Sequence, residues 1–359
     1  MDKPADSPVF AISTPIGAYH DFLPSALRSL AIQRAPFQSA LLDASGDERV
    51  KEIADAHDGM LAYRRHGPDG GQSAAIIEGW ENTTGDILGW LNADDLLFPG
   101  ALEKAVAAFE ADPDLDVVCG HSIILGDRGE MTGYHWAVEP PGPRILEAGI
   151  ISQPSCFFRR SAYERVGGLN EDLHYTMDWD LWIRLYKAGA KFGFIDAPLS
   201  MVLWGEGTKT ASFNKARRDE LRALIAEHAP AEKQKRIFQS FAIHHLLERI
   251  PAQGVRNWLS RRLSKNRTTI FGVGAEGALD ADAQIHYANL GAEPREALVL
   301  MLEHPEKVTV VDAGERDIQV ARHKDGILIS FKQAVKDGEA IGVRLKQSGG
   351  ARFRGCEWL

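Results

Sequence analysis

Two adjacent carboxylates, Asp94 and Asp95, follow a strongly apolar run and are the residues of this chain best suited to metal chemistry. The run at residues 87–91 predicts a buried strand, and Pro99 predicts the start of a helix. The pair would then lie at the carboxyl end of a strand, where open α/β sheets bind ligands. Carboxylate oxygens there suit Mg²⁺ or Mn²⁺, whose other positions take water and substrate phosphate. For an isolated pair, the alternative is a helix-capping turn.

Three further aspartates occupy comparable positions. Asp43 closes a predicted strand, Asp69 lies in a glycine-containing loop before a helix, and Asp178 stands at the start of a helix. Because the carboxyl ends of parallel strands share one edge of a sheet, several of these carboxylates can converge. A metal-bound diphosphate needs some of them, and a general base needs a carboxylate that is not a metal ligand. Each also has a local alternative, as a helix cap or a turn residue.

The elements that would position these residues alternate in period over the first two hundred residues. The predicted strands lie at residues 9–13, 40–42, 60–63, 87–91 and 116–120. The predicted helices lie between them, around residues 22–31, 50–54, 72–81 and 102–109. This alternation indicates an α/β fold with a mostly parallel sheet and helices on both faces.

The rest of the chain has a different character. Residues 211–265 are rich in charge and in Leu, Ile and Ala, and predict a helical linker region. Residues 266–359 hold short strand-like runs between turns, including a hairpin turn at residues 324–326. This pattern is typical of a small β-sandwich. We therefore divide the chain into an α/β domain at residues 1–210, the helical region, and a β-rich domain at residues 266–359.

Composition narrows the classes of function. The chain has 359 residues, a net charge of −9 and no long basic block, which argues against nucleic acid as the main partner. Three widely spaced cysteines favour a reducing, cytoplasmic setting over a disulfide framework. Residues 1–8 show no apolar signal region, and no stretch approaches the length of a transmembrane helix. Peripheral membrane association stays open.

The ordered motifs resemble those of family 2 glycosyltransferases. They lie at residues 14–15, 43–47, 69–72, 90–95, 153–160, 166–169 and 177–185. The resemblance covers roughly residues 8–210 and implies a GT-A fold. It implies an inverting, metal-dependent hexosyltransferase that uses a UDP-, GDP- or dTDP-linked sugar donor. The acceptor would be a glycan or lipid-linked glycan, in cell-surface polysaccharide synthesis at the inner face of the membrane.

The resemblance also implies a nucleotide site. Thr14 and Pro15 would line the base pocket, and Asp43 would accept a hydrogen bond from the base. Asp69 would help to close the site. The full set of residues expected to bind the nucleotide-sugar is Thr14, Pro15, Asp43, Asp69, Gly71, Gln72, Asp94 and Lys209.

The same resemblance assigns the metal and the base. Asp95, together with Asp94, would ligate Mn²⁺ or Mg²⁺, and Asp94 would also contact the ribose or the sugar. Asp178 stands where the family places its catalytic base. Many relatives have a His near the end of the domain, but residues 201–210 contain none. Lys209 is the candidate to supply a cation to the diphosphate, with an ordinary surface lysine as the alternative.

Two other classes of function stay open. A nucleotidyltransferase that makes nucleotide sugars would share the parallel sheet and the metal carboxylates, but residues 13–20 lack the Arg or Lys of a basic phosphate loop. A non-catalytic sugar-binding or assembly protein would use the β-sandwich as its working part. The sandwich could equally bind an acceptor glycan, dock a partner or form a homodimer.

Overall fold

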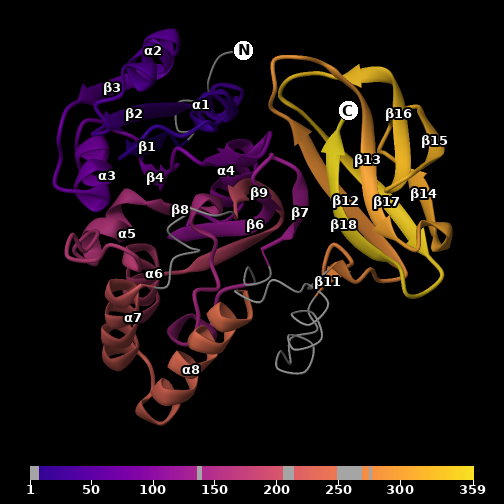
Figure 1. Cartoon of the computed structure of the whole chain (residues 1–359). Helices are drawn as coiled ribbons and strands as arrows, with labels where there is room; N and C mark the ends of the chain where they lie inside the picture. Colours follow the sequence, from indigo (N-terminus) through magenta and orange to yellow (C-terminus); the bar gives the residue numbers. More distant parts are fainter. Residues whose placement is uncertain (1–7, 136–139, 205–213, 249–268, 275–276) are drawn as a thin grey trace. The chain divides into compact units, whose positions relative to one another are not determined.

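The computed structural model describes residues 8–135, 140–204, 214–248, 269–274 and 277–359 (Figure 1). The chain divides into two compact units. The first comprises Met1–Ser122, Ala137–Val202 and Asn214–Ala229, and the second comprises Ile123–Trp136, Leu203–Phe213 and Pro230–Leu359. Residues 123–136 thus group with the C-terminal strands, and residues 214–229 group with the first unit. The predicted boundaries near residues 210 and 265 stay predictions.

The first unit is built on a mostly parallel sheet. Strand β1 lies between β2 and β4 and is parallel to both, and β3 is parallel to β2. Strand β8 joins β4 in the antiparallel sense, and β6 joins β8. The bounds are β1 (Phe10–Ile16), β2 (Phe37–Asp43), β3 (Leu61–His66), β4 (Ile87–Trp90), β6 (Val117–Leu125) and β8 (Cys156–Arg159). All residues of β1 and β4 are buried, as expected for strands covered on both faces.

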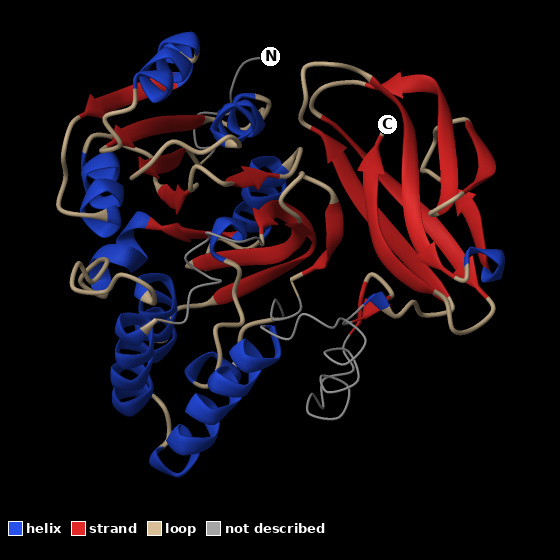
Figure 2. Ribbon diagram, in the orientation of Figure 1, coloured by secondary structure: helices blue, strands red, loops and turns tan. Residues whose placement is uncertain are grey.

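Helices cover both faces of this sheet (Figure 2). Ala11 of β1 packs with Trp80 of α3 and Trp182 of α6, whereas Phe10 and Ile12 pack with α1 and α4 on the other face. This division follows from the alternation of side chains along a strand. The bounds are α1 (Leu23–Ala31), α2 (Glu48–Ala56), α3 (Gln72–Glu81), α4 (Ala101–Ala111), α5 (Arg160–Arg165), α6 (Met177–Lys187) and α7 (Lys215–His228).

The segment after the acidic pair differs from the sequence expectation. Residues 95–97 form a short strand, β5 (Asp95–Leu97), which pairs in the antiparallel sense with β9 (Phe192–Leu203). Helix α4 begins only at Ala101, because Gly100 precedes it in the left-handed conformation with φ of 76°. Asp94 therefore lies in a turn and Asp95 opens a strand. The partner strand is about one hundred residues away, beyond the reach of a local pattern.

The second unit contains the predicted sandwich-like strands. One sheet has the order β12-β17-β14, and a second includes the order β15-β16-β13-β18-β7. The predicted hairpin is confirmed, since His323 pairs with Gly326 across the turn at residues 324 and 325. Strands β18 (Arg352–Trp358) and β7 (Met131–Tyr134) were not predicted, and they pair through Cys356 and Met131.

The remaining elements complete the description. The other strands of the second unit are β10 (Thr269–Ile270), β11 (Val273–Gly274), β12 (Asp282–Asn289), β13 (Arg295–Glu303), β14 (Val308–Asp312), β15 (Ile318–His323), β16 (Gly326–Val335) and β17 (Glu339–Gln347). Among the described residues, this unit also contains helix α8 (Ala231–Glu248). Short 3-10 helices in the described ranges are η1 (Asp58–Met60), η2 (Pro143–Leu146), η3 (Gln153–Ser155) and η6 (Pro305–Lys307). No helix within the described ranges is long and apolar enough to cross a membrane.

Candidate active site

Several of the predicted site residues lie at or just beyond the carboxyl edge of the parallel strands. Ile16 at the end of β1 is level with Asp43 at the end of β2, and Asp43 is level with His66 at the end of β3. Strand β4 ends at Trp90, two residues before Asn92. This common edge is the usual ligand-binding position in an open α/β sheet.

The base-pocket candidates differ in how their side chains are engaged. Thr14 is 1% exposed, and its hydroxyl has no hydrogen-bond partner among the described residues. Pro15 is buried beside it in β1. The Asp43 carboxylate is already occupied, because Oδ1 accepts from the Ser45 backbone at 2.8 Å and Oδ2 lies 2.9 Å from His66 Nδ1. A base contact by Asp43 therefore stays a prediction, and it would share the carboxylate with these partners.

The loop before α3 is held by Asp69. Its Oδ1 accepts from the Gly71 backbone at 2.9 Å, and its Oδ2 lies 3.3 Å from Arg65 Nη2. Gly71 precedes α3 with φ of 112°, a conformation that residues with a Cβ atom rarely adopt. The contacts of Asp69 thus support the turn directly. Arg65, which the sequence reading did not select, also pairs with Glu78 Oε1 at 2.8 Å.

The acidic pair is the electrostatic centre of the site. Asp95 is 8% exposed, and the Asn92 side-chain amide donates to its Oδ2 at 2.9 Å. Burial first, and then the neighbouring charge of Asp94, raise the pKa of Asp95 well above its ordinary value, while the Asn92 hydrogen bond lowers it. Burial and the charge of Asp94 therefore both disfavour the ionised form of Asp95. Binding of a cation beside Asp95 would relieve both effects and would be strongly favourable.

The carboxylates of Asp94 and Asp95 fit a hard divalent cation for which the protein supplies only some of the ligands. Among the described residues, no group of three or more His, Cys, Asp or Glu side chains is arranged to hold a metal ion. Mg²⁺ in particular is commonly bound through one or two carboxylates, with water and substrate phosphates as its other ligands. The pair Asp94 and Asp95 satisfies that requirement, and the other ligands would come from the donor diphosphate and water.

A chain of amide hydrogen bonds orients the Asp95 carboxylate. Gln72 Nε2 donates to Asn92 Oδ1 at 2.7 Å, and Asn92 Nδ2 also approaches Gln153 Oε1 at 3.2 Å. Gln153 Nε2 in turn donates to the Trp90 carbonyl at 2.7 Å. Asn92 and Gln153 were not selected as site residues from the sequence. Both lie within the quoted motifs at residues 90–95 and 153–160, which is the signal that could have found them.

Asp178 occupies the first turn of α6. The N-cap of this helix is Thr176, so the capping alternative does not describe Asp178. Its Oδ1 accepts from the Trp179 backbone at 2.7 Å, and its side chain is half-buried. Burial raises the pKa of Asp178, and the Trp179 backbone N–H lowers it. A carboxylate with a raised pKa is a stronger base than an exposed aspartate.

One contact connects the region of Asp178 with that of the acidic pair. The Ser73 hydroxyl, at the start of α3, lies 2.9 Å from the sulfur of Met177, the residue before Asp178. Gln72, the neighbour of Ser73, contacts Asn92 and thereby Asp95. Through Gln72 and Ser73, the start of α3 thus contacts both the partner of Asp95 and the residue before Asp178.

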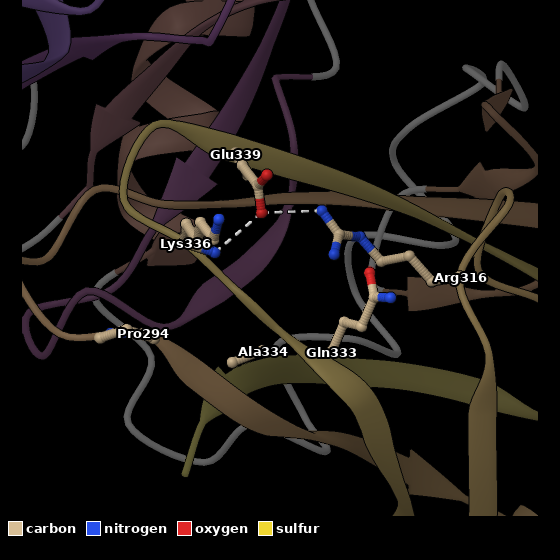
Figure 3. A pocket seen from close by; sticks show the side chains of 6 residues that line it. All are labelled: Pro294, Arg316, Gln333, Ala334, Lys336 and Glu339. Carbon is tan, nitrogen blue, oxygen red and sulfur yellow. Dashed lines mark hydrogen bonds and ion pairs between the residues drawn. The ribbon is translucent and has the colours of Figure 1, made fainter.

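Lys209, the predicted cation for the diphosphate, falls outside the described residues. A pocket of about 350 Å³ in the second unit contains none of the predicted site residues (Figure 3). There the Lys336 backbone N–H first, and then the guanidinium of Arg316 at 2.9 Å, lower the pKa of Glu339. The lining residues are Pro294, Arg316, Gln333, Ala334, Lys336 and Glu339.

The parallel sheet of the first unit and its similarity to solved structures define the fold class. The fold is GT-A, that of nucleotide-sugar-dependent glycosyltransferases. The chain is similar to Staphylococcus aureus TarS 1–349, solved in complex with UDP-GlcNAc, with a TM-score of 0.51 and 16% identity. The similarity covers 70% of this chain and 78% of that chain, and at this identity it speaks for the fold alone.

The sequence comparisons identify the segment that resembles a known family. Residues 18–167 match the family described as glycosyl transferase family 2, so the resemblance to glycosyltransferases covers this segment of the chain. The chain is 26% identical over 256 residues to the O-antigen biosynthesis protein RfbC of Myxococcus xanthus, covering 69% of this chain and 20% of that protein. It is 29% identical over 187 residues to a PGL/p-HBAD biosynthesis glycosyltransferase of Mycobacterium bovis, covering 50% of this chain and 71% of that protein. The expected family resemblance is confirmed over the matched segment.

Proposed function

We propose that this chain is an inverting glycosyltransferase that moves a sugar from a nucleotide-diphosphate donor to an acceptor hydroxyl. A divalent cation, Mn²⁺ or Mg²⁺, would be held by Asp95 and Asp94. The observation that carries the proposal is Asp95 itself. It is a buried carboxylate next to a second one, with a neutral amide partner, at the carboxyl edge of a glycosyltransferase sheet.

The residues of the chain would divide the work. Thr14 and Pro15 would border the base, with Asp43 beside them at the end of β2. Gln72 and Asn92 would keep the Asp95 carboxylate in a fixed orientation. When bound, the cation would act as a Lewis acid that stabilises the leaving diphosphate.

Asp178 would act as the general base. Its carboxylate would take the proton of the acceptor hydroxyl, whose oxygen forms a bond with the anomeric carbon of the donor sugar. The bond from that carbon to the diphosphate oxygen breaks, and its electron pair leaves with the nucleoside diphosphate. Attack from the face opposite the leaving group inverts the anomeric configuration, so an α-linked donor would give a β-linked product.

The acceptor class is suggested by the relatives. The Myxococcus xanthus relative is described by O-antigen biosynthesis and the Mycobacterium bovis relative by PGL/p-HBAD biosynthesis. We extend to this chain the assignment of a glycan or lipid-linked glycan acceptor, met at the cytoplasmic face of a membrane. Peripheral membrane association, and a homodimer formed through the second unit, belong to the same proposal.

A nucleotide panel tests the proposal. Purified chain is titrated by calorimetry with UDP, GDP, dTDP and CMP, each with Mn²⁺, with Mg²⁺ and with chelator. We expect one nucleoside diphosphate to bind selectively and only with a metal ion, and the matching nucleotide-sugar to be turned over. If no nucleotide binds with either ion, a non-catalytic sugar-binding or assembly role takes its place.

Removal of the amide that orients Asp95 is expected to weaken the metal site. Asn92→Ala deletes the hydrogen bond that lowers the pKa of Asp95, so the carboxylate holds a proton more tightly against the metal. Loss of such a supporting contact typically lowers metal affinity by about 10–100-fold. Calorimetric titration of the nucleotide at a series of fixed Mn²⁺ concentrations measures the effect.

The matched control is Asn82→Ala, an exposed asparagine at the end of α3. It should leave the Mn²⁺ affinity unchanged. An Asn92→Ala affinity equal to that of wild type would show that Asn92 does not support the metal ligand.

A further inference from the structure

The carboxylate of Glu220, on α7, binds the segment that leads into α6. Its Oε1 accepts from the Tyr175 backbone at 2.7 Å and from the Thr176 backbone at 2.6 Å. The Thr176 hydroxyl also donates to Oε1, at 2.8 Å. Its Oε2 accepts from the His174 backbone at 3.0 Å. One side chain thus meets three consecutive backbone N–H groups and a hydroxyl just before the helix that carries Asp178.

These contacts replace a local cap. The N-cap residue Thr176 makes no side-chain capping bond of its own, since its hydroxyl is turned to Glu220. The negative carboxylate lies at the positive end of the α6 dipole, an arrangement that stabilises the first turn. A second contact, from Asn214 Nδ2 to the Tyr175 hydroxyl at 2.7 Å, holds the start of α7 to the same segment.

The charges of α7 also act on Asp178. After burial and the local backbone hydrogen bonds, the remaining influences on the pKa of Asp178 are Arg217, which lowers it, and Glu220, which raises it. Among the described residues, the Cys156 thiol at the start of β8 is a further titratable group that interacts with Asp178. Two uncharged groups from other elements also contact this turn. Trp179 Nε1 donates to the Ile145 carbonyl of η2, and the Ser73 hydroxyl of α3 lies against the sulfur of Met177.

We propose that Glu220 is a positioning residue for sugar transfer, fixing the first turn of α6 and the charge environment in which Asp178 takes the acceptor proton. This inference rests on the proposed function of Asp178. Helix α7 lies outside residues 18–167, so the family match does not include Glu220. The role follows from the contacts of its carboxylate.

The pH dependence of turnover separates this role from simple support of the fold. Glu220→Gln keeps the size and one acceptor oxygen but removes the charge. The pKa of Asp178 should then fall, so the acid limb of kcat/KM, which reports the free base, should move to lower pH. The weaker base should also lower kcat at neutral pH.

The measurement follows release of nucleoside diphosphate from the UDP-, GDP- or dTDP-sugar that the wild-type chain turns over. Asp219→Asn is the matched control, because it removes an exposed carboxylate from the adjacent position of α7. Its profile should coincide with that of wild type. An unchanged acid limb in Glu220→Gln would overturn the proposed effect on Asp178.

A second measurement does not depend on activity. In Glu220→Ala, amide hydrogen exchange over residues 171–182 should accelerate, because the backbone N–H groups of residues 174–176 lose their acceptor. Unchanged exchange there would overturn the positioning role whether or not the chain is active. The proposed function can fail separately. If exchange accelerates in Glu220→Ala but the wild-type chain shows no turnover, or Asp178→Asn keeps full turnover, Glu220 still fixes the first turn of α6 while the proposed function is rejected.

Discussion

Asp178→Asn should reduce sugar transfer by about 10²–10⁴-fold, the usual contribution of a positioned general base. The substitution preserves the size of the side chain and leaves an oxygen that can accept from the Trp179 backbone, so α6 should retain its first turn. What it removes is the proton acceptor. Nucleotide binding should persist, because Asp94 and Asp95 are untouched. Single-turnover transfer and nucleotide calorimetry measure the two properties separately.

The control for Asp178→Asn is Asp172→Asn, which neutralises an exposed aspartate in the loop before α6. Its turnover should equal that of wild type. Full turnover in Asp178→Asn would remove Asp178 from the mechanism. Loss of nucleotide binding in the same variant would instead indicate that the substitution had disturbed the donor site, and the assignment as base would then lose its support.

Asp95→Asn should abolish metal-dependent nucleotide binding and, in the absence of metal, should make the chain more stable at neutral pH. The first effect follows from loss of a carboxylate ligand, since an amide oxygen carries no net charge. The second follows from burial and the adjacent charge of Asp94, which make an ionised Asp95 costly in the folded state. We expect a gain of about 1–3 kcal/mol in the free energy of unfolding, comparable with other buried polar groups.

The pH dependence gives this prediction a sign. The folded pKa of Asp95 is raised above the ordinary value of 3.8, so the folded chain keeps a proton that the unfolded chain has released. Stability therefore falls as pH rises from the ordinary value to the folded value, and the loss persists above it. The gain in Asp95→Asn should be present at neutral pH and should disappear below the ordinary value. Urea unfolding in chelator across this range measures it.

Asp86→Asn provides the comparison for Asp95→Asn. Asp86 is an exposed aspartate just before β4, at the opposite end of the strand from the acidic pair. Its substitution should change neither nucleotide binding nor the pH dependence of unfolding. If Asp95→Asn binds metal and nucleotide as wild type does, the metal site is elsewhere and the proposed donor chemistry fails.

Much of the fold could be predicted from local patterns. Apolar runs and helical spacing correctly indicated β1 to β4 and α1 to α4, because periodicity within about ten residues reflects which face of an element is buried. The turn at residues 324 and 325 was predicted in the same way. Strand β7 was missed because its short run, interrupted by Gly133, becomes a strand by pairing with β6 and with the distant β18.

For the candidate site too, some features could be predicted from local patterns and others depend on the tertiary structure. The sequence by itself determined that Asp43, Asp94 and Asp178 stand at or after strand ends or at helix starts, since these positions follow from the order of elements. Only the tertiary structure decided which neighbours those carboxylates meet. Gln153 reaches Asn92 across 61 residues and Glu220 reaches Thr176 across 44. Burial, charge and hydrogen bonding at a site depend on contacts between residues that are far apart in the sequence, and a local pattern does not predict such contacts.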